Sequence, residues 1–311
     1  MKKIIVYIAL MLIMVLGISI LSYGGKNMKI EVNGGTINGK LIDASKDKLV
    51  IFVAGSGPTD MNGNTPLVEG DNDSFLQLAK ELKKEGISTF RYDKRTAGES
   101  LETFNNEGGI VFDDFIDDLN AVIKEMKALG YEKVVIMGHS QGSLIGMISA
   151  KEMGVDGYIS IAGSGENIGK TMIKQYMVDE NMYANHIDLI NKLLKGETKA
   201  NGEEIDPMFN MINQEFLLTW MKYNPKQEIA KLQIPILIIQ GLKDLQVKEY
   251  DAKLLDESAN DSELVLIEDM NHVLKEIGSD EDNVKSYGDP SYSLSKEMIS
   301  NISEYTNKIG Q

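Results

Sequence analysis

Apolar residues follow two alternating spacings along most of the chain. Short continuous apolar runs are typical of strands buried on both faces of a sheet, and apolar residues every three to four positions are typical of helices. The runs predict strands at 48–54, 87–92, 133–137, 155–162, 234–239 and 263–267. The second spacing predicts helices between and after them, at 74–84, 113–129, 140–153, 247–258 and 293–307. This order predicts an α/β fold with a mostly parallel central sheet and helices on both faces.

Two stretches depart from this alternation. Residues 29–33 and 36–43 alternate every second position and predict two edge strands that form a hairpin. Residues 163–231 contain helical segments only, rich in methionine and aromatic residues, and we expect an inserted helical cap there. Most of these side chains should bury the cap against the core. The predicted organisation is a core at 28–162, a cap at 163–231 and the rest of the core at 232–311.

The first 27 residues have a different pattern. Two lysines follow Met1, and residues 4–21 are apolar and nearly uncharged. A basic start followed by an apolar run is typical of an export signal, although this run is also close to the length that spans a bilayer. We expect residues 1–27 to be either a cleaved signal peptide or a retained N-terminal membrane anchor. The protein would then be exported, and either secreted or anchored to the outer face of the cytoplasmic membrane.

Composition narrows the possible chemistry. The hydrophobic fraction of 42% is sufficient for a large core, and 47 acidic against 32 basic residues give a net charge of −15. Such a charge repels phosphate backbones, so we expect no nucleic-acid partner. The chain has no cysteine, which excludes disulfides and a cysteine nucleophile. Its three histidines are scattered, and we expect no metal and no other cofactor.

Ser140 is the candidate nucleophile. It is the centre of the segment Gly-His-Ser-Gln-Gly at 138–142, between a predicted buried strand and a predicted helix. A tight turn in this position strains the serine backbone, and glycines on both sides avoid collisions with the strand and the helix. The amides at the helix N-terminus point at the centre where negative charge develops during acyl transfer. The sequence therefore predicts that Ser140 attacks a carbonyl carbon.

A serine hydroxyl needs a general base, and elimination among the histidines favours His272. His139 is adjacent to Ser140, where neighbouring side chains diverge, so we expect it to be a packed structural residue. His186 lies among polar residues of the predicted cap, and we expect it at the surface. His272 lies in a loop directly after a predicted strand.

A carboxylate should hold the base in one tautomer and stabilise its charged form. We favour Asp244, which closely follows the most apolar strand, at the sheet edge where Ser140 and His272 should also emerge. Asp269 is the alternative, with Glu268 beside it. A different role for Asp244 is to cap the helix that follows it.

The order serine, aspartate, histidine resembles that of the α/β-hydrolase superfamily, and the resemblance extends over nearly all of residues 28–311. Within the superfamily the chain is most similar to bacterial esterases and serine aminopeptidase-like hydrolases. The resemblance rests on residues 53–58, 138–142, 241–244 and 271–272. It implies an α/β-hydrolase fold with an oxyanion hole formed by the backbone amides of Ser56 and Gln141. The Ser56 amide belongs to the Gly-Ser-Gly-Pro-x-Asp loop at 55–60.

A second loop departs from the superfamily pattern at one position. Residues 91–100 resemble the loop D-x-R-G-x-G-x-S, but Thr96 replaces a glycine. We expect Asp93 and Arg95 to brace this loop. The departure bears on the local loop geometry and not on the three candidate catalytic residues.

These residues predict an exported carboxylesterase that cleaves esters of small to medium acyl groups through an acyl-enzyme on Ser140. A water activated by His272 would release the acyl group. One alternative is an amidase or aminopeptidase-like serine hydrolase, and another is a non-catalytic binding protein with the same fold. The expected partner is a small-molecule ester or amide, and membrane association is expected through residues 4–21 only.

Overall fold

The computed structural model describes residues 24–104, 109–197, 206 and 209–310. The apolar run at 4–21, which carries the export prediction, lies outside this part of the chain. None of the helices within it is both long enough and apolar enough to span a membrane.

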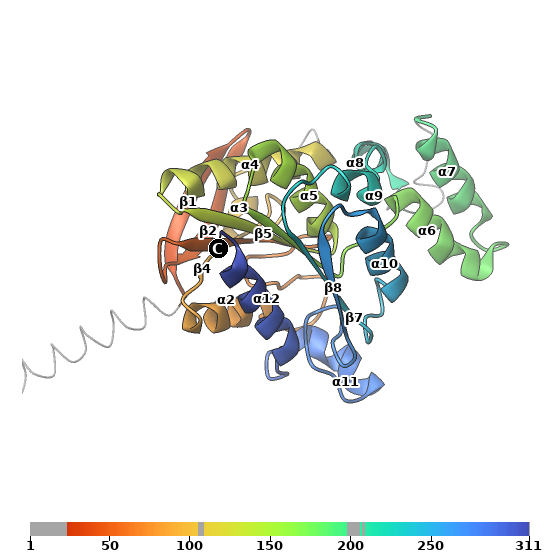
Figure 1. The fold of residues 1–311 in the computed structure, drawn as a ribbon. Helices are drawn as coiled ribbons and strands as arrows, with labels where there is room; N and C mark the ends of the chain where they lie inside the picture. The colour runs from red at the N-terminus through yellow and green to blue at the C-terminus, as the bar shows by residue number, and fades with distance from the viewer. Residues whose placement is uncertain (1–23, 105–108, 198–205, 207–208, 311) are drawn as a thin grey trace, which may run out of the picture.

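An eight-stranded sheet forms the centre of the molecule, in the order β1-β2-β4-β3-β5-β6-β7-β8 (Figure 1). β1 pairs with β2 and β2 with β4 in antiparallel fashion, and all the other pairs are parallel. The predicted edge hairpin and the mostly parallel sheet are both confirmed. The strands are β1 (Lys26–Val32), β2 (Gly35–Ile42), β3 (Lys48–Val53), β4 (Ser88–Tyr92), β5 (Lys133–His139), β6 (Gly157–Ile161), β7 (Ile236–Gly241) and β8 (Ser262–Ile267).

Helices cover both faces of the sheet (Figure 1). α4 (Phe112–Ala128), α5 (Gln141–Met153) and α10 (Glu249–Ser258) pack on one face. α2 (Ser74–Lys84) and α12 (Lys296–Lys308) pack on the other face. Two further short helices, α3 (Gly98–Leu101) and α11 (Asp280–Lys285), lie in segments for which the apolar pattern predicted no helix.

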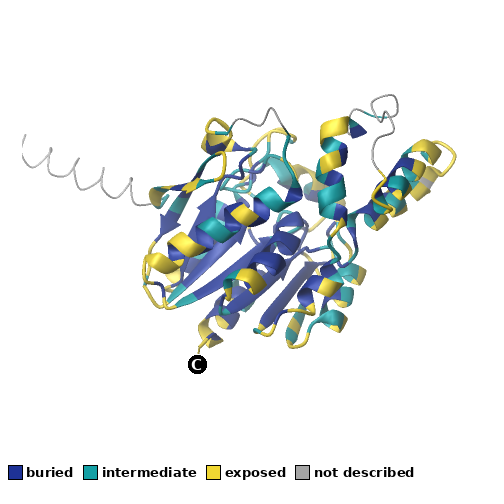
Figure 2. Ribbon diagram, turned by 90° about the horizontal axis from the view of Figure 1, so that it is seen from above, coloured by how far each residue is buried: buried dark blue, intermediate teal, exposed yellow. Residues whose placement is uncertain are grey.

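The alternation of side chains along each strand explains the continuous apolar runs. In β5, Val134 and Ile136 pack against α4 and α5, whereas Val135 and Met137 pack on the side of α2 and α12. Neighbouring residues of a strand point to opposite faces, so a strand covered on both sides must be apolar at every position. Figure 2 shows the result, with buried strands between helices that expose only their outer sides.

The stretch between β6 and β7, for which a cap was predicted, is helical. It contains α6 (Ile168–Tyr176), the 3-10 helix η1 (Met177–Asp179), α7 (Ala184–Leu194), α8 (Met211–Met221) and α9 (Pro225–Ile229). α6, α7 and α8 share a small core of their own that includes Met172, Leu193 and Met221. α8 attaches to the main body through Trp220, whose ring stacks on Phe112 with centroids 5.5 Å apart.

The prediction of a surface position for His186 was wrong. Its side chain is only 13% exposed, and its ring lies 4.9 Å from that of Tyr176 and 5.7 Å from that of Phe209. Tyr176 ends α6, His186 lies in α7 and Phe209 lies just before α8, so these rings meet only when the three segments pack together. The polar residues next to His186 along the chain gave no indication of this packing.

Candidate active site

Ser140 occupies the turn between β5 and α5. Its φ and ψ angles are 54° and −120°, a region that non-glycine residues rarely adopt. The surrounding glycines are required by packing. A Cβ atom on Gly138 would lie 2.4 Å from the carbonyl oxygen of Gly142, and one on Gly142 would lie 2.2 Å from that of Val53. The chain is thus held tightly on both sides of Ser140, and the serine side chain lines a cavity at the edge of the sheet.

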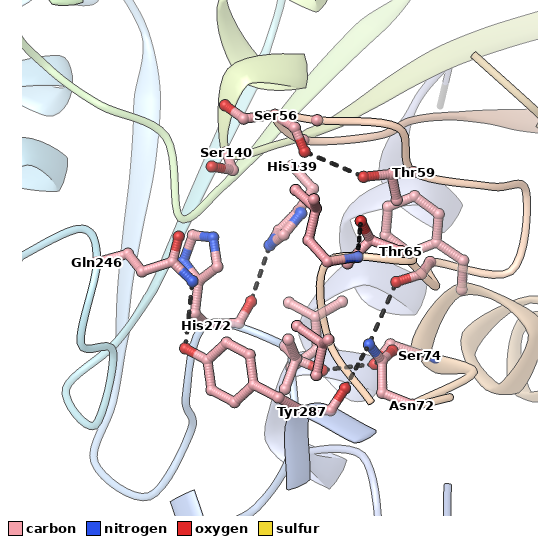
Figure 3. A pocket seen from close by; sticks show the side chains of 18 residues that line it. Ser56, Thr59, Thr65, Asn72, Ser74, His139, Ser140, Gln246, His272 and Tyr287 are labelled. Atoms are coloured by element: carbon pink, nitrogen blue, oxygen red, sulfur yellow. Dashed lines mark hydrogen bonds between the residues drawn. The ribbon is translucent and has the colours of Figure 1, made fainter. Parts of the chain in front are cut away.

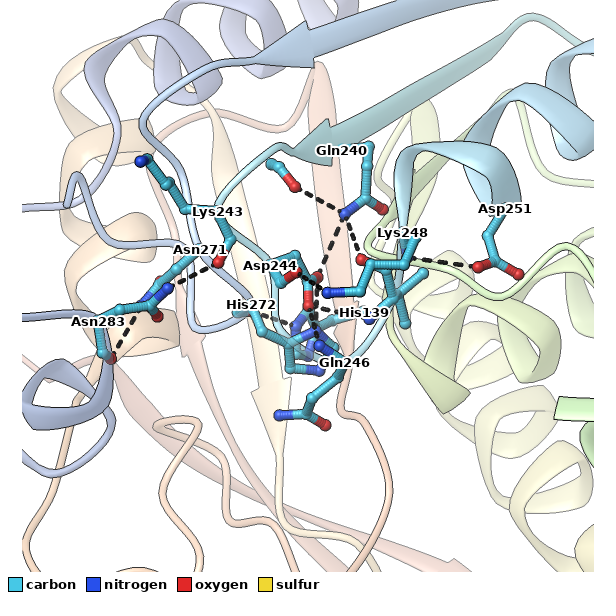
Figure 4. Close-up of polar contacts among 12 residues, drawn as sticks. His139, Gln240, Lys243, Asp244, Gln246, Lys248, Asp251, Asn271, His272 and Asn283 are labelled. Atoms are coloured by element: carbon cyan, nitrogen blue, oxygen red, sulfur yellow. Dashed lines mark hydrogen bonds and ion pairs between the residues drawn. The ribbon is translucent and has the colours of Figure 1, made fainter. Parts of the chain in front are cut away.

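Asp244 and His272 are in direct contact beside this cavity (Figure 4). The Nδ1 atom of His272 donates to the Oδ2 atom of Asp244 at 2.8 Å, and both residues are buried. The same oxygen accepts a 3.3 Å bond from the side-chain amide of Gln240. The Oδ1 atom accepts the backbone N–H groups of Gln246 and Val247 at 2.7 and 2.9 Å. Four donors therefore surround one carboxylate.

The structure also shows where the two alternative carboxylates lie and whether Asp244 caps a helix. Asp269 and Glu268 are exposed in the turn after β8. Asp244 does not cap α10, because the residue before that helix is Lys248. It instead binds the turn that precedes the helix through Oδ1 and His272 through Oδ2.

The hydrogen bonds to Asp244 control its charge. Burial raises the pKa of this carboxyl group, but the bond to His272 and the N–H groups of Val247 and Gln246 outweigh burial, and the net pKa is lowered. Asp244 is therefore a carboxylate at neutral pH. Its charge favours the orientation in which His272 carries a proton on Nδ1 and leaves Nε2 free to accept one.

His139 packs against the histidine loop. Its Nε2–H donates to the backbone carbonyl of His272 at 2.8 Å, and its ring meets that of Phe75 edge to face. Burial, and to a smaller extent the nearby His272, lowers the pKa of His139 to about 3, so its ring is neutral. These contacts agree with the expectation of a packed structural residue, and they fix the backbone that carries His272.

The backbone amides of Ser56 and Gln141 flank Ser140. Gln141 is the first residue of α5, where an amide has no acceptor within the helix. Ser56 follows β3 in an exposed loop, whose shape is held by a 3.1 Å bond from the Thr59 hydroxyl to the Ser56 carbonyl. Within the described part of the chain, neither amide donates to another backbone carbonyl. Both remain available to a bound oxygen atom.

Three cavities adjoin the Ser140 turn, and Ser140 itself lines two of them. The first has a volume of about 320 Å³ and is lined by Ser140 and His272 together with apolar and neutral polar side chains (Figure 3). No hydrogen bond joins Ser140 to His272 in this view of the site. The second, about 340 Å³, lies beyond Ser56 and Gln141 and is walled by Phe115 and by aromatic residues of α8. The third, about 130 Å³, lies under α6 and includes Glu166.

The loop at residues 91–100 is braced as expected. The Asp93 carboxylate accepts the N–H groups of Met61 at 2.7 Å and Glu99 at 3.0 Å, and burial raises its pKa to about 6. Arg95 donates two hydrogen bonds of 2.8 and 2.7 Å to Asp118. Thr96 fits where a glycine is usual, because the residue with positive φ in this loop is Gly98.

The sequence analysis missed Lys94, which lies in the same loop. Its side chain is buried, and Nζ donates to the Gly55 carbonyl at 2.8 Å and to the Oε1 atom of Gln141 at 2.9 Å. The only signal in the sequence was a lysine two positions after a strand that is buried throughout. Among the described residues, no group of His, Cys, Asp or Glu side chains is arranged to hold a metal ion.

Comparisons with known proteins agree with this fold. A family model described as "Serine aminopeptidase, S33" matches residues 71–166 of this chain. Esterase EstD of Thermotoga maritima is 27% identical over 234 residues, which cover 72% of this chain. The match spans about half, 54%, of the Thermotoga protein. An uncharacterized peptidase of Bacillus subtilis, YtmA, is 24% identical over 62% of this chain and 71% of its own length.

Solved structures agree on the fold. The Pyrococcus furiosus esterase Pf2001 aligns with a TM-score of 0.60 at 17% identity, over 92% of this chain and 91% of that one. Est1E from Butyrivibrio proteoclasticus, solved with ferulic acid bound, aligns with a TM-score of 0.57 at 16% identity, over 90% and 96% of the two chains.

Proposed function

We propose that the protein is a serine hydrolase that cleaves carboxylic esters of small to medium acyl groups through an acyl-enzyme on Ser140. The observation that carries the proposal is the strained Ser140 turn beside the buried Asp244–His272 pair, all at one edge of the sheet. In the first step, His272 Nε2 takes the proton of the Ser140 hydroxyl as its oxygen attacks the ester carbonyl. The absence of a bond between the two in Figure 3 is compatible with this step, because such bonds often form only when substrate is bound.

The tetrahedral intermediate would place its oxyanion between the amides of Ser56 and Gln141. His272 then returns the proton to the leaving alcohol, and the acyl group stays on Ser140. A water molecule, deprotonated by His272, then attacks the acyl carbon. The bond to Ser140 Oγ breaks, His272 returns the proton to that oxygen, and the acid is released. Throughout, the Asp244 carboxylate stabilises the positively charged form of His272.

The experiment that tests this proposal is hydrolysis of p-nitrophenyl esters by the wild-type protein and by Ser140→Ala. We expect the variant to lose essentially all of the wild-type turnover and to stop reacting with a fluorophosphonate probe. Ser143→Ala is a matched control, since Ser143 lies one turn further along α5 and binds Tyr158 and Ser160 away from the cavity. Full activity in Ser140→Ala would rule out the mechanism. Absence of ester hydrolysis and of probe labelling in the wild type would instead favour a non-catalytic binding protein.

Cleavage of amides is the second candidate, because the family description and the Bacillus relative both refer to peptidases. An aminopeptidase needs a group that receives the substrate's positively charged amine. Glu166 is the one carboxylate among the described residues that line the three cavities around Ser140, and it is already paired with Lys174. This pairing supports esters as the preferred substrate. Turnover of acyl esters compared with aminoacyl amides decides between the two.

We also propose that the protein is exported, on the basis of the two lysines and the apolar run at 4–21. The test is fractionation of cells that produce the full chain with a C-terminal tag, followed by N-terminal sequencing. A mature protein that starts after the run indicates a cleaved signal peptide, whereas an intact protein in the membrane fraction indicates an anchor. An intact protein in the cytosol contradicts export.

A further inference from the structure

Lys94 is a buried cation without a counter-charge. The residue is 4% exposed, and among the described residues no carboxylate forms a salt bridge with it. The titratable side chains on the elements around it include Asp60 in the loop after β3, Asp93, Arg95 and Glu99 after β4, Asp113, Asp114, Asp117 and Asp118 on α4, and His139 at the end of β5. Arg95 binds both Asp114 and Asp118, Asp93 accepts two backbone N–H groups, and His139 is neutral. A buried, unpaired charge is costly, so its position needs an explanation.

The bonds of Lys94 join the two segments that flank Ser140. The Gly55 carbonyl, 2.8 Å from Nζ, belongs to the peptide group whose N–H is that of Ser56. The Gln141 side chain, 2.9 Å from Nζ, belongs to the residue that carries the other candidate oxyanion amide. The ammonium also lies 4.2 Å from the centre of the Phe115 ring, which holds it on its third side.

We infer that Lys94 is a positioning residue of the oxyanion hole. Its ammonium holds the Ser56 and Gln141 amides at a fixed separation and adds positive charge near the developing oxyanion. A bond to the Gly55 carbonyl also polarises the peptide group and makes the Ser56 N–H a stronger donor. This inference rests on the proposed esterase function.

The environment makes the charge dependent on pH near neutrality. Burial lowers the pKa of Lys94 to about 7. Deprotonation above this pH removes the positive charge, although a neutral amine still has hydrogens to donate. Turnover should therefore fall as the pH rises through about 7.

The test is Lys94→Met, which keeps the length and removes the charge. Just below neutral pH we expect kcat for a p-nitrophenyl ester to fall about ten- to a hundredfold while KM changes little, because the lost interaction acts in the transition state. The melting temperature should change little, because removing an unpaired buried charge offsets the loss of the donor to the Gly55 carbonyl and the Gln141 side chain. The variant should also lose the decline of kcat above pH 7.

Two further variants make the test specific. Lys127→Met is the matched control, because Lys127 also donates to two backbone carbonyls, those of Met153 and Gly154, far from the cavity. It should retain wild-type kcat. Gln141→Ala keeps its backbone N–H and removes only the side-chain acceptor. If Lys94 acts through Gln141, the double variant should lose less than the product of the two single losses.

The outcomes separate this inference from the proposed function. Wild-type kcat in Lys94→Met, with Ser140→Ala inactive, overturns the role of Lys94 and leaves the esterase proposal intact. Lost activity together with a clearly lower melting temperature assigns Lys94 a merely structural role and also overturns the inference. A wild-type kcat that stays constant above pH 7 overturns the role of its charge. A wild-type protein without ester hydrolysis and probe labelling refutes the proposed function itself.

Discussion

Replacing Asp244 with asparagine probes the carboxylate that orients the proposed base. Each oxygen of Asp244 accepts two hydrogen bonds, Oδ2 from His272 and Gln240 and Oδ1 from two backbone N–H groups. Asparagine has nearly the same shape but carries an NH₂ group at one of these positions. In either orientation this group faces two donors, so two hydrogen bonds are lost. The orientation that keeps the backbone bonds deprives His272 of its acceptor and favours the wrong tautomer.

The expected loss in kcat is about 10⁴-fold, the size found when a triad aspartate is replaced in this way. At about 1.4 kcal/mol per tenfold, this corresponds to about 5 kcal/mol of transition-state stabilisation. The assay is p-nitrophenyl ester hydrolysis. The matched control is Asp269→Asn, because Asp269 is the exposed carboxylate that was the alternative partner for His272. The control should retain full kcat. A loss below about tenfold in Asp244→Asn, or a large loss in the control, refutes the assignment.

The same variant also has a pH-dependent effect on stability. Because the folded-state pKa of Asp244 is lowered below its ordinary value of 3.8, its stabilising contribution is present above that pH and is lost as the pH falls. The difference in free energy of unfolding between wild type and Asp244→Asn, measured by urea denaturation, should therefore shrink on acidification below about pH 4. A difference that stays constant into strong acid contradicts the lowered pKa.

Two further predictions concern the scaffold of the site. Gly142→Ala places a Cβ atom 2.2 Å from the Val53 carbonyl oxygen, so we expect a loss of at least about 1–3 kcal/mol of stability in thermal unfolding. Gly278→Ala, where no atom lies within 4 Å of the added Cβ, should be nearly neutral, and equal losses in the two variants would contradict the packing argument. Arg95→Met leaves Asp118 buried without its partner and should cost about 3–5 kcal/mol in urea denaturation. A loss below about 1 kcal/mol would mean that Asp118 finds another partner or takes up a proton.

The parts of the fold that could be predicted from the sequence are those in which burial determines residue type. The strands β3, β5 and β7 are covered on both faces, so they are apolar throughout and easily recognised. α11 could not be predicted in this way. It is a six-residue helix with the sequence Asp-Glu-Asp-Asn-Val-Lys, and it has no apolar face. Polar contacts hold it in place, and their partners are distant in the sequence.

The candidate triad could be predicted because each member follows a recognisable strand. Ser140 follows β5, Asp244 follows β7 and His272 follows β8, and parallel strands bring their carboxyl ends to one edge of the sheet. The side chains that hold these residues did not follow this rule. Gln240 lies within β7 itself, where its buried amide interrupts an apolar run. Its contact with Asp244 is visible only in the folded chain.

α11 shows how such unrecognised elements serve the site. The Asn283 side chain donates to the Lys243 carbonyl at 2.7 Å, next to Asp244. The same side chain accepts a 3.0 Å bond from Asn271, next to His272. The side-chain amide of Asn283 therefore links the loop that carries Asp244 to the loop that carries His272.

Lys94 has the same relation to the other half of the site, because it joins the Ser56 loop to the start of α5. Each half of the site is thus held by one buried polar side chain, Asn283 in one and Lys94 in the other. Removing the Lys94 ammonium relieves an uncompensated buried charge but leaves the Gly55 carbonyl and the Gln141 side chain without their donor, so the two effects on stability oppose each other. A mutant at this position that keeps its stability and loses turnover would show that the buried charge serves to fix the amides and not to stabilise the fold.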